Sequence, residues 1–273
     1  MAVTNVYAPA TAVLEDVIVE TPSIRTFVLR PAAPMAFRAG QFVQLTMPGV
    51  GEAPFTPSSS PHEPDRIEIT VLRTGRVTQA LHNVEPGAEL GLRGPFGKGY
   101  PLDKLRGTEV LLVGGGVGLA PLRSLICVLL AEIDQFQKVV IRYGAKSPDE
   151  LLYRRQFDQW RSTEGVDFAE TIDVPAPGWD GHVGLVTSLM TDDLGIDIAN
   201  SYMVSCGPAI MLRFVTLRAM ELGYQPPQIH LSMNRRMSCG IGKCGRCNIG
   251  PYYLCKDGPD MCYDKIKDYP NVF

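Results

Sequence analysis

The sequence predicts an antiparallel β domain, then a parallel α/β domain, then a small cysteine-rich segment. Over the first hundred residues, short apolar or β-branched runs alternate with turn residues, and no long helical pattern interrupts them. Around Gly107 the pattern changes to alternating strands and helices. Five of the seven cysteines fall within the last 35 residues. We therefore expect domains at 1–106 and 107–230 and a tail at 231–273.

The first domain is expected to be a barrel of antiparallel strands. Glycine, proline and other turn residues bound each apolar run, at spacings that suit such a barrel. The candidate strands cover residues 12–20, 24–31, 40–49, 66–75 and 89–97.

The second domain is expected to hold a parallel sheet. Residues 107–133 show a buried strand, a glycine turn and a helix in succession, and the alternation continues along the chain. Further strands are predicted at 138–145, 202–208 and 228–233, and helices at 149–160, 184–194 and 209–223.

Composition and charge exclude some classes of function. Hydrophobic residues make up 45% of the chain and charged residues 20%, and the formal net charge is −3. This balance lacks the basic footprint of a nucleic-acid-binding protein. No apolar run approaches eighteen residues, and the N-terminus lacks a basic segment followed by an apolar one. We expect a cytoplasmic protein without membrane insertion.

A glycine cluster follows the first parallel strand. Glycines without side chains let a phosphate approach the backbone, and the next helix would face it with its N-terminus. A tight strand-to-helix turn is the alternative explanation, and the spacing is not that of the G-x-G-x-x-G fingerprint. The candidate phosphate-binding residues are Gly114, Gly115, Gly116 and Gly118.

GGGVGLAP, together with the later SCGP, resembles the nucleotide-binding half of the ferredoxin-NADP reductase superfamily. The resemblance implies that the glycine turn binds the pyrophosphate of NAD(P) and that Cys206 lies beside the nicotinamide, with Gly207 and Pro208 completing the site. Cys206 is thus the catalytic candidate. A small apolar residue at a strand end is the alternative. Both segments follow strands of one parallel sheet, so we expect them to flank one cleft.

The same resemblance implies that the N-terminal barrel binds FAD. In GEAPFTPSSSP, Phe55 stands at the aromatic position and Thr56 at the hydroxyl position, but Ala53 replaces the family arginine. Arg73 is our candidate substitute, because a guanidinium can pair with phosphate in a bidentate way. A core aromatic is the alternative for Phe55, and an N-cap is the alternative for Thr78. The flavin contacts implied after the barrel strand are Val71, Leu72, Arg73, Gly75, Val77 and Thr78.

The cysteine spacing C-x4-C-x2-C, followed by x7-C, indicates a 2Fe-2S cluster of the plant-ferredoxin type. Glycines between the cysteines would let the loop wrap around sulfide and present amides to it. Structural zinc is the main alternative, and Cys262 is a spare thiol. The expected ligands are Cys239, Cys244, Cys247 and Cys255.

The run from RRMSC to CKDGP resembles the tails of dihydroorotate dehydrogenase electron-transfer subunits and of cytoplasmic hydrogenase gamma subunits. This resemblance implies a subunit that passes electrons between NAD(P)H, FAD and a 2Fe-2S cluster, to or from a partner iron–sulfur enzyme such as a hydrogenase. A non-catalytic module, stabilised by zinc or sensing redox state, and a stand-alone oxidoreductase with a small acceptor are the alternatives.

The sequence leaves the choice between NADH and NADPH open. Basic residues after the second parallel strand could bind a 2′-phosphate, but a solvated helix face explains them equally well. These residues, with the serine beside them, are Lys146, Ser147, Arg154 and Arg155.

Overall fold

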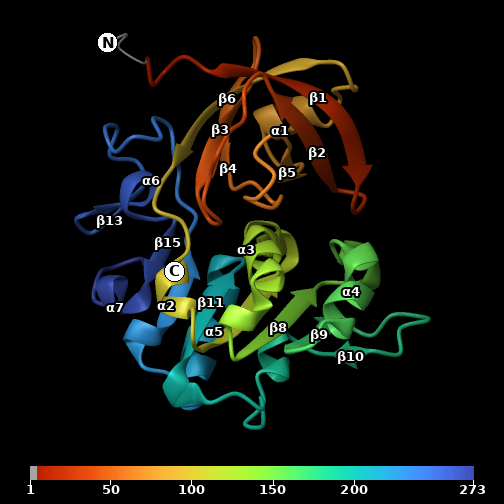
Figure 1. The fold of residues 1–273 in the computed structure, drawn as a ribbon, viewed down its shortest axis with the longest axis vertical. Coiled ribbons are helices and arrows are strands. Elements are labelled where there is room, and N and C mark those ends of the chain that lie inside the picture. The colour runs from red at the N-terminus through yellow and green to blue at the C-terminus, as the bar shows by residue number, and fades with distance from the viewer. Residues whose placement is uncertain (1–4) are drawn as a thin grey trace.

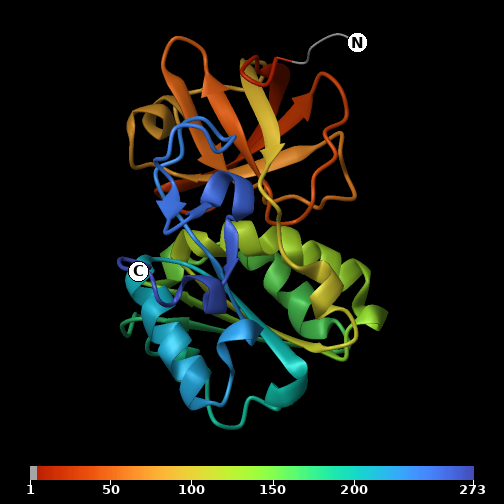
Figure 2. The ribbon, with the colours of Figure 1, turned by 90° about the vertical axis from the view of Figure 1, so that its left-hand side faces the viewer.

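The computed structural model describes residues 5–273. The antiparallel domain lies at one end of the molecule and the α/β domain at the other, and the C-terminal segment runs along one side of both (Figures 1 and 2). Among the described residues, no helix is both long and apolar enough to cross a lipid bilayer.

The N-terminal domain is a six-stranded antiparallel sheet in the order β4-β3-β6-β1-β2-β5. The predicted antiparallel domain is confirmed, with one strand more than expected, because GEAPF continues the sheet as β4. Within residues 5–273 the edge strands β4 and β5 do not pair with each other, so the sheet is not a closed barrel. The elements are β1 (Ala10–Val19), β2 (Ile24–Pro31), β3 (Phe42–Met47), β4 (Gly51–Phe55), β5 (Ile67–Leu72), α1 (Arg76–Leu81) and β6 (Glu89–Phe96).

Alternating side chains build the core of this domain. Along β5, Ile67, Ile69 and Val71 are fully buried together against the inner residues of β2 and β3. Glu68 and Thr70, which point the other way, are also buried, although both are polar. The outer face of β5 is therefore covered by another part of the chain, which is the α/β domain.

The second sheet has seven strands in the order β10-β9-β8-β7-β11-β12-β15. All neighbouring pairs are parallel except β12 with β15. Helices α3 and α4 cover one face and α5 covers the other, as the two separate core clusters show. The elements are α2 (Leu102–Leu105), β7 (Glu109–Gly115), α3 (Leu119–Ala131), β8 (Lys138–Ala145), α4 (Phe157–Ser162), β9 (Val166–Ile172), β10 (His182–Val183), β11 (Ser201–Cys206), α5 (Ala209–Glu221) and β12 (Ile229–Ser232).

Two predicted helices of this domain are wrong. Residues 149–160 form short 3₁₀ turns and the beginning of α4, because Tyr153 takes a left-handed backbone conformation with φ of 56°. Its ring is fully buried, so tertiary packing overrides the helical pattern there. Residues 184–194 form only one 3₁₀ turn, Val186–Leu189. The remaining 3₁₀ turns are Gly116–Gly118, Ile133–Gln135, Pro148–Glu150, Arg154–Gln156, Ile198–Asn200 and Pro226–Gln228.

The C-terminal segment has little regular structure of its own. Its strand β15 extends the second sheet at β12, with Ser232 opposite Asp260, so the segment is anchored to the α/β domain. The preceding cysteine loop reaches the antiparallel domain instead (Figure 2). The elements are β13 (Asn248–Ile249), β14 (Tyr252–Tyr253), α6 (Leu254–Asp257), β15 (Asp260–Cys262) and α7 (Tyr263–Ile266).

Candidate functional site

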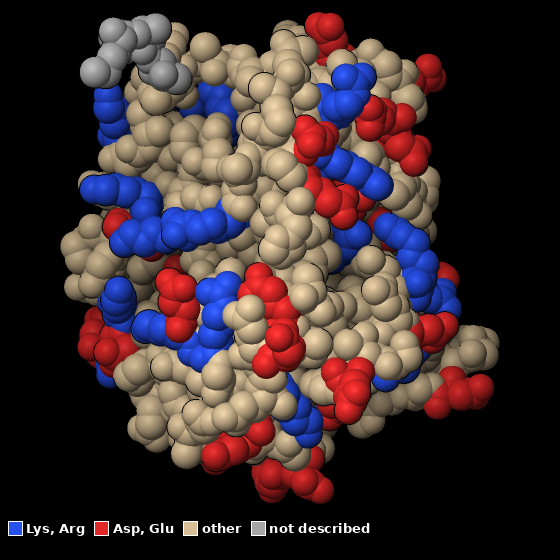
Figure 3. All heavy atoms as spheres, viewed as in Figure 1, with Lys and Arg blue, Asp and Glu red and all other residues tan. Residues whose placement is uncertain are grey.

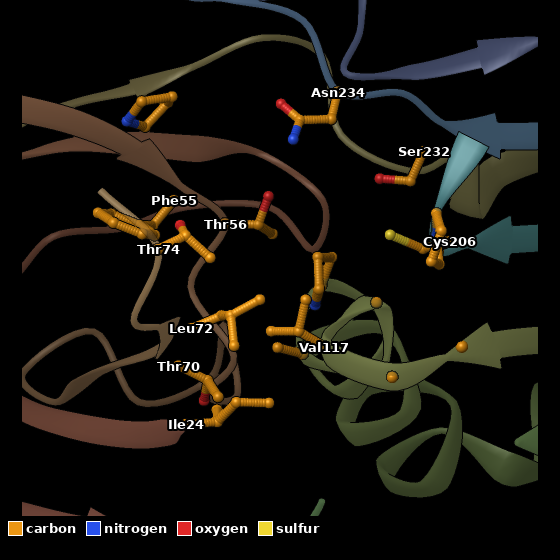
Figure 4. Close-up of a pocket in the computed structure, with 18 of the residues that line it drawn as sticks. Ile24, Phe55, Thr56, Thr70, Leu72, Thr74, Val117, Cys206, Ser232 and Asn234 are labelled. Carbon is orange, nitrogen blue, oxygen red and sulfur yellow. The ribbon is translucent and has the colours of Figure 1, made fainter. Parts of the chain in front are cut away.

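A cleft of about 670 Å³ lies between the two domains. Strands β4 and β5 form one wall, and the turns after β7 and β11 form the opposite wall (Figure 4). Ser232, the last residue of β12, and Asn234, just beyond it, close one end. The cleft therefore lies at the carboxyl ends of the parallel strands, where open α/β sheets bind their ligands.

On the antiparallel side, four of the predicted flavin residues line the cleft: Phe55, Thr56, Leu72 and Thr78. Others do not. Val71 lies on the opposite face of β5, in the core, because side chains alternate along a strand. Arg73 is exposed on the surface. The remaining predicted residues outside the lining are Gly75 and Val77.

Thr78 is not an N-cap, since Gly75 occupies that position of α1 and Thr78 is the third residue of the helix. Its hydroxyl oxygen accepts hydrogen bonds from the backbone amides of Thr74 and Gly75, at 2.9 and 2.8 Å. These two amides are thus already bonded within the chain.

On the nucleotide side, the two predicted turns meet. A Cβ atom on Gly118 would lie 2.3 Å from the carbonyl oxygen of Cys206, so only glycine fits there. Gly115 and Gly116 line the cleft together with Gly118. Gly114 does not line it, because it packs against the first turns of α3.

Cys206 reaches the cleft with its buried side chain, as do Gly207 and Pro208. Burial raises the pKa of its thiol to about 11, with Asp260 adding to the rise and a hydrogen bond from Ser232 opposing it. The thiol therefore stays protonated near neutral pH. A neutral, weakly polar group suits the wall of a nicotinamide site, and a thiolate nucleophile is not what this environment favours.

Met211, on α5, packs against both cleft turns, a contact that sequence reasoning missed. Its sulfur fills the space between the two turns, since a Cβ atom on Gly115 or Gly207 would meet it at 2.1 or 2.6 Å. A methionine side chain is flexible and can repack when a ligand enters. Helical spacing on α5 gave no signal for this position, because the contact depends on how the two turns meet.

The basic residues that could bind a 2′-phosphate lie in different places in the structure. Lys146 lines the cleft, together with Glu150. Arg155 does not, because it forms a bidentate ion pair with Glu20 of the antiparallel domain, at 2.8 and 2.9 Å. Arg154 lies beside a separate, shallow pocket.

The cysteine loop directs backbone amides at sulfur. The amides of Ile241, Lys243 and Cys244 donate to Sγ of Cys239 at 3.3 to 3.5 Å, and the amide of Gly242 donates to Sγ of Cys255 at 3.0 Å. The loop can turn in this way because its glycines adopt left-handed conformations with φ between 75° and 77°. They are Gly240, Gly242 and Gly245.

These amides act on the ionisation of the thiols. Burial raises the pKa of Cys239, but the amides outweigh it and lower the pKa to about 6. Burial and the adjacent Cys247 raise the pKa of Cys255 to about 12. The loop therefore stabilises negative charge on the Cys239 sulfur, as a thiolate ligand of a cluster requires. Within residues 5–273, no three His, Cys, Asp or Glu side chains are placed to hold a single metal ion.

Cys262 lies apart from this loop. It belongs to β15, and its thiol faces the backbone carbonyls of Pro226 and Pro227, at 3.8 and 3.6 Å. The four cysteines of the loop and the spare cysteine are thus separated by the fold.

Comparison with known families agrees with this division of the chain. Residues 11–100 match the oxidoreductase FAD-binding domain, and residues 112–216 match the oxidoreductase NAD-binding domain. Residues 234–267 match the iron–sulfur cluster binding domain of dihydroorotate dehydrogenase B. This last match favours an iron–sulfur cluster over the zinc alternative.

Known relatives cover most of the chain. It is 34% identical over 243 residues to the sulfhydrogenase 1 gamma subunit of Pyrococcus furiosus, covering 86% of this chain and 82% of that protein. It is also 34% identical to a probable dihydroorotate dehydrogenase B electron-transfer subunit of Methanocaldococcus jannaschii, covering 95% and 91%. The chain belongs to the ferredoxin-NADP reductase-like family of FAD- and NAD-binding oxidoreductases.

A solved structure of this family shares the whole architecture. The NADH-dependent reduced ferredoxin-NADP oxidoreductase superposes with a TM-score of 0.75 at 25% identity, covering all of this chain and 95% of that one. The chain is therefore an oxidoreductase with binding domains for FAD, NAD and an iron–sulfur cluster, and the sequence-based family assignment is confirmed.

Proposed function

We propose that this chain is the electron-transfer subunit of a redox complex, in which it exchanges electrons with NAD(P)H and passes them through a 2Fe-2S cluster to or from an iron–sulfur partner such as a hydrogenase. The observation that carries the proposal is the cleft, where the glycine turns, Cys206 and the antiparallel wall converge. The relatives named above as hydrogenase and dehydrogenase subunits support the role of a subunit.

The residues of the cleft fit the cofactors that the family binds. Phe55, Thr56 and Leu72 offer an apolar and hydroxyl-bearing wall for FAD, and the close-packed glycines leave the backbone open to a dinucleotide phosphate. When bound, FAD converts between the electron pairs of nicotinamide and the single electrons of an iron–sulfur cluster. The residues of the chain would position the cofactors, supply a neutral thiol at Cys206 and exclude water from the cleft.

The proposed phosphate contacts of the flavin depart from the family pattern. Ala53 lies on β4, paired with Leu45, and supplies no guanidinium. Arg73 remains our candidate because it is exposed on the segment that leads from β5 into α1, from where its long side chain can reach a phosphate at the rim.

The cluster ligands in this proposal are Cys239, Cys244, Cys247 and Cys255. Their loop is the most cationic part of the chain, since residues 236–256 contain four basic residues and no acidic one. Lys and Arg side chains gather on the side of the molecule where the C-terminal segment lies (Figure 3). These charges offset the negative charge of a cluster with four thiolates. We also propose three units at 1–106, 107–230 and 231–273 and a cytoplasmic location, which seven free cysteines support.

Cofactor content tests the proposal directly. Protein purified without oxygen and reconstituted with FAD, iron and sulfide is expected to hold one FAD, two iron and two acid-labile sulfide per chain, with an EPR signal after reduction. Cys247→Ser should lose the iron and sulfide, whereas the matched variant Cys262→Ser should keep both. A wild-type chain that binds zinc but no sulfide would overturn the cluster assignment. Isolation of the native complex would identify the partner.

A further inference from the structure

A buried arginine of the antiparallel domain lies against the cysteine loop. Arg93, on β6, is only 4% exposed. Its guanidinium donates to both carboxylate oxygens of Glu52 on β4, at 3.0 and 2.6 Å. Two of its nitrogens also face the backbone carbonyl oxygen of Cys239, at 3.4 and 3.5 Å, and one of them donates to the carbonyl oxygen of Val6 at 3.0 Å. The planar fork of five N–H donors lets one side chain bind all three partners at once, which lysine cannot do.

An aromatic pair, Phe96 and Phe42, connects Arg93 and the cysteine loop to the cleft. The Arg93 guanidinium lies 5.5 Å from the ring centroid of Phe96. Phe96 packs so closely on the cysteine loop that a Cβ atom on Gly240 would come within 2.9 Å of its ring. The other side of Phe96 contacts Phe42, with ring centroids 5.6 Å apart, and Phe42 lines the cleft. A packed path thus runs from the cleft to the turn that begins at Cys239.

We infer that Arg93, paired with Glu52, is a positioning residue that holds the Cys239–Gly240 turn against the flavin-binding domain and sets the electrostatic potential at the iron–sulfur cluster. This inference rests on the cluster assignment in the proposed function.

The charges explain why the pair would matter to the cluster. Four thiolates and two sulfides on two ferric ions give a net charge of about −2, and reduction adds one more negative charge. A buried cation nearby favours reduction, and a carboxylate nearby opposes it. In the wild-type chain the two charges of the pair largely cancel. Removal of either one leaves the other uncompensated: the Arg93 guanidinium is buried and weakly screened, whereas the Glu52 side chain is 31% exposed and is screened more.

The test is the midpoint potential of the cluster, measured by EPR-monitored redox titration of the reconstituted full-length protein. Arg93→Gln leaves the carboxylate and should lower the potential, whereas Glu52→Gln leaves the guanidinium and should raise it. We expect the shift in Glu52→Gln, which leaves the buried guanidinium, to change the reduction equilibrium about tenfold, which is about 59 mV for one electron, and the shift in Arg93→Gln to be smaller. The double variant should return toward the wild-type potential.

Opposite signs separate an electrostatic role from a structural one, because loss of a structural contact would act alike in both variants. Arg142→Gln is the matched control, since Arg142 is also buried and pairs with Asp167, but on β8 in the other domain. It should leave the cluster potential unchanged. Arg93→Lys keeps the charge but loses the fork, so it should keep the potential while losing the cluster faster to a chelator.

The outcomes separate this inference from the proposed function. If the wild-type chain holds no cluster, the proposed function fails. If the wild-type chain holds one, unchanged potentials in both variants, or shifts of the same sign, overturn the inference. If Arg93→Gln fails to retain the cluster, Glu52→Gln alone decides, because only a raised potential supports the role of the pair.

Discussion

Two buried arginines, each paired with a glutamate, lie where the antiparallel domain meets its neighbours, and they differ in their other partners. Arg123 of α3 binds Glu68 at 2.5 Å and the carbonyl of Ser58 at 2.8 Å, and its guanidinium lies 4.8 Å from the ring centroid of Tyr153. Arg93 binds Glu52 at 2.6 Å and the carbonyl of Val6 at 3.0 Å, and it reaches the carbonyl of Cys239 in the cysteine loop at 3.4 Å. The Arg123 interface involves only groups of the polypeptide. The Arg93 interface includes the cysteine loop, whose position we propose is fixed by a cluster.

Further contacts strengthen the interface on the Arg123 side. Glu20, whose side chain is almost fully buried, accepts hydrogen bonds from Arg155, from the hydroxyl of Thr26 and from the amide of Tyr153. The Tyr153 hydroxyl in turn bonds to Thr70 at 2.6 Å. A buried polar network whose members are satisfied specifies one arrangement of its parts. The comparison therefore indicates that contacts within the polypeptide fix the relative position of the two domains that form the cleft.

Breaking the Arg123 pair should have the largest effect on stability. Arg123→Leu removes the buried partner of the Glu68 carboxylate, which keeps only its ion pair with the half-exposed Arg66 at 2.7 Å, and we expect a loss of about 3 kcal/mol in the free energy of unfolding. Denaturant unfolding of the cofactor-free protein measures it. Arg106→Leu, at a more exposed pair with Asp103 and Glu132, should cost at most about 1 kcal/mol.

A second variant sharpens this prediction. Replacement of both partners, Arg123→Leu with Glu68→Leu, also removes the buried carboxylate and should recover part of the loss. Equal losses for Arg123→Leu and Arg106→Leu would contradict the view that the buried pair specifies this interface.

A smaller effect is expected where the network can compensate. Tyr153→Phe removes the bond to Thr70, but Thr70 keeps its hydrogen bonds to Thr26 and Ser58, at 2.8 and 2.9 Å. We expect a loss of about 1 kcal/mol, measured by the same unfolding experiment. Tyr7→Phe is the control at an exposed tyrosine and should have no effect. A loss for Tyr153→Phe larger than that for Arg123→Leu would reverse the ranking.

Sequence reasoning predicted what local pattern encodes. The change from strand to strand–helix alternation at Gly107 predicted both sheets, because periodicity reports which faces are buried. The glycine turn and SCGP were recognisable motifs, and the structure brings Gly118 against Cys206. The left-handed Tyr153 and the missing helix at 184–194 were unpredictable, since tertiary packing decides them.

The contacts that join the domains also left no local signal. Arg93 and Cys239 are 146 residues apart in the chain, and Arg93 stands in a strand pattern that would suit any exposed arginine. Glu68 and Thr70 alternate with apolar residues, so they looked like the solvent face of β5. Only the placement of α3 shows that this face is an interface. The structure therefore reveals pairs of polar residues far apart in the chain, which the sequence pattern does not indicate.

The smallest expected difference concerns pH on the β5 side. His82 follows α1 and is buried, with Nε2 3.0 Å from the carbonyl oxygen of Val71. Burial lowers the pKa of His82 below its usual value near 6.5; the bond to Val71 opposes this shift, and Arg25 and Arg73 add to it. Between the folded pKa and about 6.5, the unfolded chain binds more protons, so stability falls as the pH is lowered through this window.

Because a single proton is involved, the free energy of unfolding changes by at most about 1.4 kcal/mol per pH unit. Unfolding free energies measured from pH 5 to pH 8 should therefore change less with pH in His82→Gln than in the wild type. Parallel curves for the wild type and His82→Gln would show that His82 is as free to protonate in the folded chain as in the unfolded one, and that burial beneath the β5 segment imposes no cost on its charge.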